Sequence, residues 1–344
     1  MPKMRRSTAT GWERRIFRTG VAWVLGLFAL ASGAFAANVL AETSAVSGLT
    51  AFLSEHIAAP ARDLLFGIIL TKQFAFFFAL TGLLAVVLPA TRKERFFSKS
   101  LLQDFIWFVY QHMFLWIMLG TYVTWLKAGV DNHFPHLASD ALQAWPWWAK
   151  LVFGLLLVDL LDWAQHLLMH KVPILWKFHK LHHSQREINF FTNYRTHFVD
   201  DLTFNLVSVL PFVFLSFEIP QIWIILVIRK WHPILIHANI RTNLGPLKYF
   251  MVTPQSHRVH HSLQPEHFDK NYGCVFAIWD QMFGTQVRDY EVYPDTGIHE
   301  EFPVEQDYKW WQVPFLPILQ SLYPFKEIGQ ELVGAKPTTA DQQQ

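Results

Sequence analysis

Cysteine is almost missing from this chain of 344 residues, which contains one, Cys274. A single thiol cannot form an intrachain disulfide, and it cannot build the thiolate cage of many structural zinc sites. The zinc hydrolase motif HExxH is absent as well. Any metal chemistry must therefore use nitrogen and oxygen ligands, without the glutamate base of that motif.

Charge is also scarce: 16% of the residues are charged and 52% are hydrophobic, whereas soluble domains have about 25% charged residues. This composition indicates an integral membrane protein. A helix crosses a hydrocarbon core of ~30 Å with about 20 residues. We predict four crossings, at residues 21–40, 64–88, 105–126 and 145–168.

The placement of lysine and arginine predicts the orientation of these helices. Basic residues cluster before the first run, after the second and after the fourth, whereas loops 41–63 and 127–144 have few. We therefore expect both termini, and everything after about residue 170, to face the cytoplasm. The alternative for the first run is a cleaved signal peptide, because residues 34–36 resemble a cleavage site.

Residues 202–236 form two apolar stretches that are separated at 217–220, where Pro220 interrupts the pattern. We predict a helical hairpin that dips into the bilayer or crosses it twice. Trp310 and Trp311 follow in a proline-rich segment, which is typical of an interfacial anchor. Residues 334–344 are expected to be disordered.

Histidine is abundant, and eleven of the seventeen histidines lie between residues 166 and 261. Three boxes stand out: HLLMH at 166–170, HKLHH at 179–183 and HRVHH at 257–261. Residues three and four apart share a helix face, so we expect each box to aim all its rings one way. Asp162 and Asp159 precede the first box on the same face, and either carboxylate could orient a ligating ring.

A lone histidine, such as His56, His112 or His299, is best explained as structural. The boxes are different, because their eight rings would repel one another if protonated and would lose hydration if buried, and a bound cation relieves both problems. Eight ligands exceed one zinc site, which indicates two adjacent ions. Imidazole suits zinc, copper, iron and nickel alike, so spacing leaves the metal open.

These boxes, with His237-Ala238-Asn239 between them and the stretches DKNYG at 269–273 and IWDQMFGT at 278–285, resemble the fatty acid hydroxylase and sterol desaturase superfamily. The resemblance covers about residues 150–290 and is greatest to its alkylglycerol monooxygenase-like and bacterial branch. It implies an all-helical integral membrane enzyme that holds two non-haem irons at the cytoplasmic face.

The resemblance also implies the iron ligands, which are His166, His170, His179, His182, His183, His237, His257, His260 and His261. His197 lies in RTHFVD, which resembles an Arg-x-His-Pro-x-Glu segment with phenylalanine in place of proline and aspartate in place of glutamate. We regard it as a weak ligand or a residue that orients one. His232 has the same two possible roles, and its alternative is a histidine that snorkels beside Arg229 and Lys230.

The domains expected on this basis are N-terminal membrane helices at 1–145, a catalytic domain at 146–290 and an interfacial segment at 291–333. The implied reaction is the dioxygen-dependent hydroxylation of a lipid C–H bond. Desaturation on the same site is the alternative, and a membrane protein that merely binds or transports metal is a third, less favoured reading.

Electrons would come from a separate donor, because the chain has neither a fused haem module nor a glycine-rich dinucleotide fingerprint. In members of the superfamily the donor is a cytochrome b5, a ferredoxin or tetrahydrobiopterin. The other expected partners are the lipid substrate, dioxygen and the membrane, with no nucleic acid.

Overall fold

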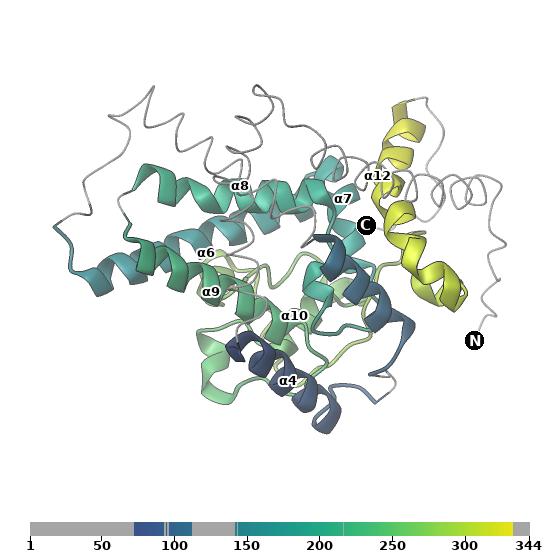
Figure 1. Ribbon diagram of the computed structural model, residues 1–344, viewed down its shortest axis with the longest axis horizontal. Coiled ribbons are helices and arrows are strands. Elements are labelled where there is room, and N and C mark those ends of the chain that lie inside the picture. Colours follow the sequence, from purple (N-terminus) through teal and green to yellow (C-terminus); the bar gives the residue numbers. More distant parts are fainter. Residues whose placement is uncertain are drawn as a thin grey trace, which may run out of the picture.

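The computed structural model of the protein describes residues 72–92, 94, 96–111, 142, 144–215 and 217–332 (Figure 1). Within these ranges the chain is helical and has no strand, and its extended segments meet in isolated bridges such as Met251 with Phe276. The all-α class predicted from the sequence is confirmed for this part of the chain.

The α-helices are α4 (Lys72–Val87), α6 (Trp147–Lys171), α7 (Pro173–His183), α8 (Phe198–Phe214), α9 (Ile219–Ile236), α10 (Pro254–His260), α11 (Ile278–Phe283) and α12 (Leu316–Leu332). Residues 99–111 are also helical. The short 3-10 helices are η4 (Thr192–Tyr194), η5 (Gly245–Tyr249), η6 (Pro265–His267), η7 (Glu305–Asp307) and η8 (Trp310–Phe315).

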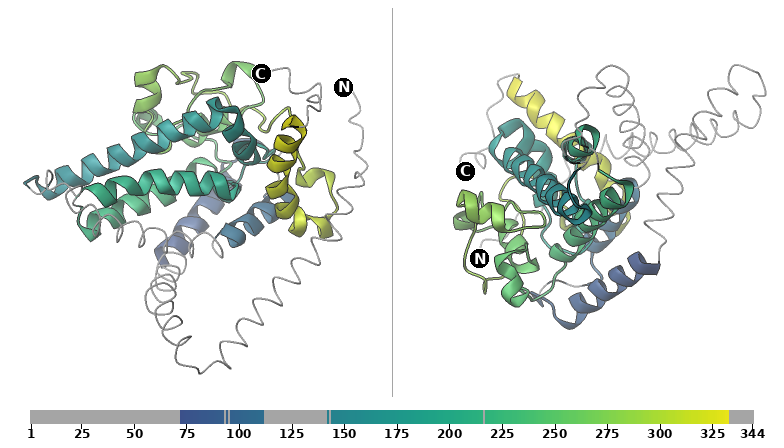
Figure 2. Two further views of the ribbon diagram at one scale, coloured as in Figure 1. Left: turned by 90° about the horizontal axis from the view of Figure 1, so that it is seen from above. Right: turned by 90° about the vertical axis from the view of Figure 1, so that its left-hand side faces the viewer.

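Helix α6 is the central element, and it packs against α7, α8 and α9 (Figures 1 and 2). Its many leucines favour the helix, which begins after Pro146 and ends at Lys171. Proline restricts the residue before it to extended backbone, so Pro173 holds Val172 out of the helix and separates α6 from α7. The turn places the end of α6 beside α7.

Among the described residues, α6 is the one helix long and apolar enough to cross a membrane. It lies where the fourth crossing was predicted. The second predicted crossing is described from residue 72 and holds the shorter apolar helix Phe77–Val87. The third is described, as helix, to residue 111, and the first lies outside the described residues, as do 334–344.

Helices α8 and α9 are the two arms of the hairpin predicted at residues 202–236, and Figure 2 shows both running beside α6. Helix α8 ends at Phe214 and α9 begins at Ile219. Glu218 caps α9 in a reciprocal pair with Gln221, and Pro220 occupies the first turn, where its missing N–H is tolerated. Glu218 also accepts a hydrogen bond from Lys150 Nζ at 2.8 Å, which fastens α9 to the start of α6.

A fully buried ion network fixes the segment that joins α7 to α8. Arg195 Nη1 lies 3.2 Å from Asp104 Oδ1 and 3.1 Å from Glu305 Oε2, and Arg195 also donates to the Ser184 hydroxyl. These partners come from residues 99–111, from η7 and from the end of α7. Both carboxylates contact the guanidinium, so no charge in the buried network lacks an opposite charge beside it. The network also connects residues 99–111 and η7 to the end of α7, which carries the second histidine box.

Candidate metal centre

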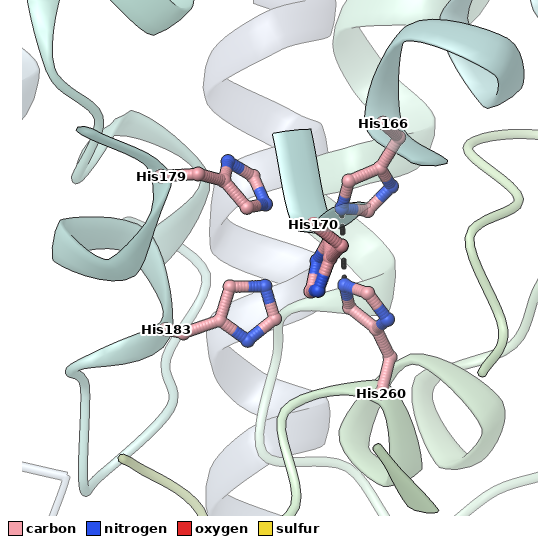
Figure 3. Close-up of side chains that lie close together, drawn as sticks. All are labelled: His166, His170, His179, His183 and His260. Atoms are coloured by element: carbon pink, nitrogen blue, oxygen red, sulfur yellow. Dashed lines mark hydrogen bonds between the residues drawn. The ribbon is translucent and has the colours of Figure 1, made fainter. Parts of the chain in front are cut away.

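All nine histidines expected as ligands lie together in two groups. Within each group, one ring nitrogen per residue lies within 4.8 Å of the others. The first group, shown in Figure 3, contains His166, His170, His179, His183 and His260. The second group contains His182, His237, His257 and His261. The members come from α6, α7, α10 and the ends of α9 and α10.

The two HxxHH boxes are each divided between the groups. His179 and His183 belong to the first group, and His182 belongs to the second. The third box is divided in the opposite sense, because His257 and His261 join the second group while His260 joins the first. The expectation that each box aims all three rings one way was therefore wrong. Each helical residue turns by about 100°, so positions i and i+4 are about 40° apart, whereas i+3 lies about 60° to the other side.

In the first group, outer partners hold several rings by Nδ1 and leave Nε2 facing inward. His170 Nδ1 is more loosely placed, 3.9 Å from Asp269 Oδ1. Nε2 of His260 meets Nε2 of His166 at 3.0 Å (Figure 3). The outer contacts are His166 Nδ1 with Tyr272 O at 2.8 Å, His179 Nδ1 with Asp200 Oδ2 at 2.7 Å, and His260 Nδ1 with Lys270 O at 2.7 Å.

The second group converges in the same way on its Nε2 atoms. His237 caps α9, and its Nδ1 lies 2.7 Å from Pro233 O, so the ring turns inward from the helix end. Its Nε2 lies 3.1 Å from Nε2 of His182 and 2.8 Å from Nε2 of His257. Nε2 of His257 in turn lies 3.2 Å from Nε2 of His261.

The donor set fits metal ions. In the second group, Nε2 of His237 and Nε2 of His257 face each other, and each also faces a third ring nitrogen. One proton between the two rings cannot make hydrogen bonds in all of these directions, whereas a cation can accept all of the lone pairs. Six buried ring nitrogens have no hydrogen-bond partner among the described residues. Three are Nε2 atoms of the first group, on His170, His179 and His183, and these are available to a metal. The other three are Nδ1 of His182, His257 and His261, on the opposite side of rings whose Nε2 atoms converge.

Burial also keeps the rings neutral. It lowers the pKa of His260 to about 3, and it lowers the pKa of His237 to about 4. Burial, with the neighbouring rings, lowers the pKa of His261 well below its ordinary value. At neutral pH these rings offer lone pairs, as metal ligands must.

Two cavities reach the histidines. The first chamber, of about 130 Å³, touches members of both groups, including His166 and His179 of the first and His182 of the second. The second chamber, of about 180 Å³, touches the first group at His170, His183 and His260. A molecule in the first chamber therefore has access to both groups.

His197 and His232 lie outside both groups. His197 Nδ1 accepts a hydrogen bond from the Val199 amide at 3.1 Å, and its Nε2 lies 3.0 Å from the Ser321 carbonyl. His232 Nε2 lies 2.9 Å from the Val252 carbonyl. The ring of His197 uses both nitrogens within the fold, so neither is left for a metal.

Asp162 and Asp159 were expected to orient ligating histidines, but their carboxylates bind other groups. Asp162 binds Arg229 Nε at 2.6 Å and the Ser208 hydroxyl at 2.5 Å. Asp159 accepts from the backbone amides of Val275 and Phe276 and from the Trp279 indole. Both carboxylates thus fasten α6 to its neighbours, and their hydrogen bonds within the described residues reach no histidine.

The carboxylates that do support the rings were not singled out from the sequence. Asp200 holds His179 directly. Asp280 accepts from the amides of Tyr272 and Gly273 at 2.9 and 2.7 Å, and so shapes the turn whose carbonyl meets His166. Both aspartates lie in stretches that carry the family resemblance, Asp200 in RTHFVD and Asp280 in IWDQMFGT. The resemblance alone did not assign either carboxylate to a histidine.

Comparison with known proteins gives a matching family. Residues 151–285 match the fatty acid hydroxylase family model. Alkylglycerol monooxygenase of Xenopus tropicalis is 31% identical over 192 residues, which are 49% of this chain and 41% of that protein. Ornithine lipid hydroxylase of Rhizobium tropici is 33% identical over 172 residues, which are 46% of this chain and 52% of that protein.

A third relative, human cholesterol 25-hydroxylase, is 26% identical over 246 residues, which cover 67% of this chain and 85% of that protein. The chain spans about half the length, or less, of the first two relatives. No solved structure matches the chain. The matched region holds all nine grouped histidines.

Proposed function

We propose that the chain is a membrane-bound, dioxygen-dependent lipid hydroxylase with two irons, because residues 151–285 match the fatty acid hydroxylase family model. The observation that carries this proposal is the convergence of nine buried imidazoles in two groups beside one chamber. Hydroxylation consumes dioxygen, a pair of electrons and two protons, inserts one oxygen atom into a C–H bond and releases the other as water.

Each histidine group would hold one iron, and the pair would supply the oxidising chemistry with dioxygen that an unactivated C–H bond requires. The protein's own contribution is placement. Tyr272, Lys270 and Pro233 fix ring orientations through their carbonyls, and Asp200 does so through its carboxylate. Fixed rings position the ligand atoms before a metal arrives, which raises affinity.

The first chamber is the site we assign to the substrate, since it adjoins both groups. Its walls come from α6, α8 and α9, and these helices carry exposed apolar side chains, among them Val152, Leu210 and Ile224. Apolar surface of this kind suits a hydrocarbon surrounding. A lipid could therefore reach the chamber from the bilayer without crossing water.

The electron donor would be a separate molecule, of the cytochrome b5, ferredoxin or tetrahydrobiopterin kind. It must reach the histidines from the cytoplasm if the topology inferred from lysine and arginine is correct. A reporter fused after Gln344 should then read cytoplasmic, and a reporter inserted near Asp131 should read exterior. The opposite pattern would contradict both the topology and the route for electrons.

The reaction is tested by comparing lipid extracts of a deletion strain and its parent by mass spectrometry. A lipid of the parent that carries one oxygen more than its precursor in the deletion strain would support hydroxylation. A difference of two hydrogens would instead support the alternative, desaturation on the same site. Identical lipid profiles would count against both.

A further inference from the structure

The wall of the first chamber combines apolar surface with many hydrogen-bonding side chains. Hydrogen-bonding side chains enter it from residues 99–111, from η4, from the segment before α8 and from α8 itself. They are Gln111, Asn193, Thr196, Asp200, Asp201 and Asn205. Arg229 and Lys230 of α9 also line the chamber, and the charge of Lys230 acts on Asp201. Phe204, Pro233 and Ile236 provide apolar surface in the same chamber.

Much of the charge in this wall is already paired with other wall residues. Asp162 forms its ion pair with Arg229, and Asp200 Oδ2 holds His179. Asp201 accepts from Gln111 Nε2 at 2.5 Å and from Thr196 Oγ1 at 2.6 Å. The chamber therefore suits a neutral, hydrogen-bonding occupant better than one that brings an unpaired charge.

A carboxylate oxygen in the wall lacks a donor. Asp200 is 1% exposed, and its Oδ1 has no hydrogen-bond partner among the described residues. Leaving such a group against hydrocarbon is unfavourable, and more so when it is charged. The interior of an acyl chain would impose that cost, whereas a hydroxyl, amine or amide N–H of the occupant would remove it.

The chamber admits a small part of a lipid at a time. Its volume of about 130 Å³ is close to that of a cavity that holds one benzene molecule, which has about six heavy atoms. The polar wall and the histidines therefore act on the same short section of the substrate. A carbon that faces the rings cannot be far from the group that faces Asp200.

Resting on the proposed function, we propose that this chamber selects lipids by a neutral hydrogen-bond donor, and that the oxidised carbon lies within about six atoms of that donor. Asp200 Oδ1 accepts from the donor, and the amide of Asn193, which also lines the chamber, contributes a second contact. The part of the lipid that reacts is thus its head group or the atoms next to the head group. The middle of the acyl chain stays outside the first chamber.

The test supplies isotopically heavy dioxygen to membranes that contain the full chain, its electron donor and a total lipid extract of the expressing strain. Tandem mass spectrometry then locates the heavy oxygen within each labelled lipid. Label within about six atoms of a hydroxyl, amine or amide is expected. Label in the distal half of a hydrocarbon chain would overturn the inference while leaving lipid hydroxylation intact, and no labelled lipid would sink the proposed function itself.

A variant tests the wall directly. Asn193→Leu keeps the side-chain size and removes its hydrogen bonds, and Asn193 contacts neither histidine group through a hydrogen bond in the described structure. We expect an apparent KM for the same extract that is roughly tenfold higher, with bound iron and kcat near those of the parent. Asn243→Leu, in a loop outside the chamber, is the control. An unchanged KM in Asn193→Leu would remove Asn193 from substrate recognition and contradict the inference.

Discussion

Asp200 and His179 form a buried pair in which carboxylate Oδ2 lies 2.7 Å from ring Nδ1. A carboxylate in this position fixes the tautomer of the ring and leaves Nε2 for a metal. Removing such an outer partner typically lowers metal affinity about 10 to 100-fold. We expect that loss in Asp200→Ala, measured by metal titration of the purified protein.

The control for this change is its neighbour. Asp201 binds Gln111 and Thr196 and makes no hydrogen bond to a ring. Asp201→Asn should therefore bind metal as the parent does. Equal affinities in Asp200→Ala and Asp201→Asn would show that the His179 contact does not matter for metal binding.

The two groups predict a metal content of about two ions per chain, one for each group. Because His182 belongs to one group and His260 to the other, replacing either by alanine should mainly affect one ion. Each variant should then hold roughly one ion per chain by elemental analysis, and both should lose activity. His299→Ala, outside both groups, should keep the full content. A loss of all metal from either variant alone would argue for a single shared site.

Asp162 and Arg229 form an ion pair whose side chains are 3% and 12% exposed. Asp162→Leu leaves a buried guanidinium without its partner, which costs about 3–5 kcal/mol. We expect a clear fall in the melting temperature in detergent. Much of it should return in Asp162→Leu/Arg229→Met, where neither charge remains.

The exposed pair of Lys171 with Asp269 provides the comparison, since its side chains are 52% and 43% exposed. Solvent screens such a pair, so Lys171→Met should cost at most about 1 kcal/mol. Equal destabilisation in Lys171→Met and Asp162→Leu would mean that burial does not set the strength of these pairs.

Gly273 lies in the turn that Asp280 shapes beside His166. A Cβ at this position would lie 2.8 Å from the Phe276 carbonyl oxygen and 2.7 Å from a Val252 methyl group. The backbone must move to accept it, so Gly273→Ala should lower both the melting temperature and metal retention. Gly329→Ala, in α12 with nothing within 4 Å of its Cβ, should be neutral or slightly stabilising. Normal metal retention in Gly273→Ala would show that the turn does not control His166.

The sequence predicted the ligand set well because histidine spacing is a local property of a helix. The pairs His166 with His170 and His179 with His183 are four residues apart, and each pair stays in one group. The division of the boxes could not be predicted in the same way. Whether His182 meets His183 or His237 depends on where the end of α9 lies, and no local pattern reports that.

The same limit explains the misplaced aspartates. Asp162 lies one turn from His166, so proximity along α6 favoured a contact between them. In the folded chain Arg229 of α9 takes the carboxylate instead. Asp200, which is 21 residues from His179, reaches the ring because the Arg195 network folds the intervening segment back. Short-range reasoning finds ligands that share a helix, whereas their supports come from across the fold.

The partnerless Nε2 atoms of His170, His179 and His183 also bear on how much of this protein a cell can keep. A chain that folds around those rings before metal binds buries several polar atoms without a hydrogen bond. Each of these atoms lowers the free energy of unfolding. Metal binding removes that penalty and adds its own free energy to folding. Proteases remove chains that open often. If the metal is the iron proposed above, iron supply should therefore set the lifetime of the protein in the cell, so that iron-starved cultures hold less of it at an unchanged rate of synthesis.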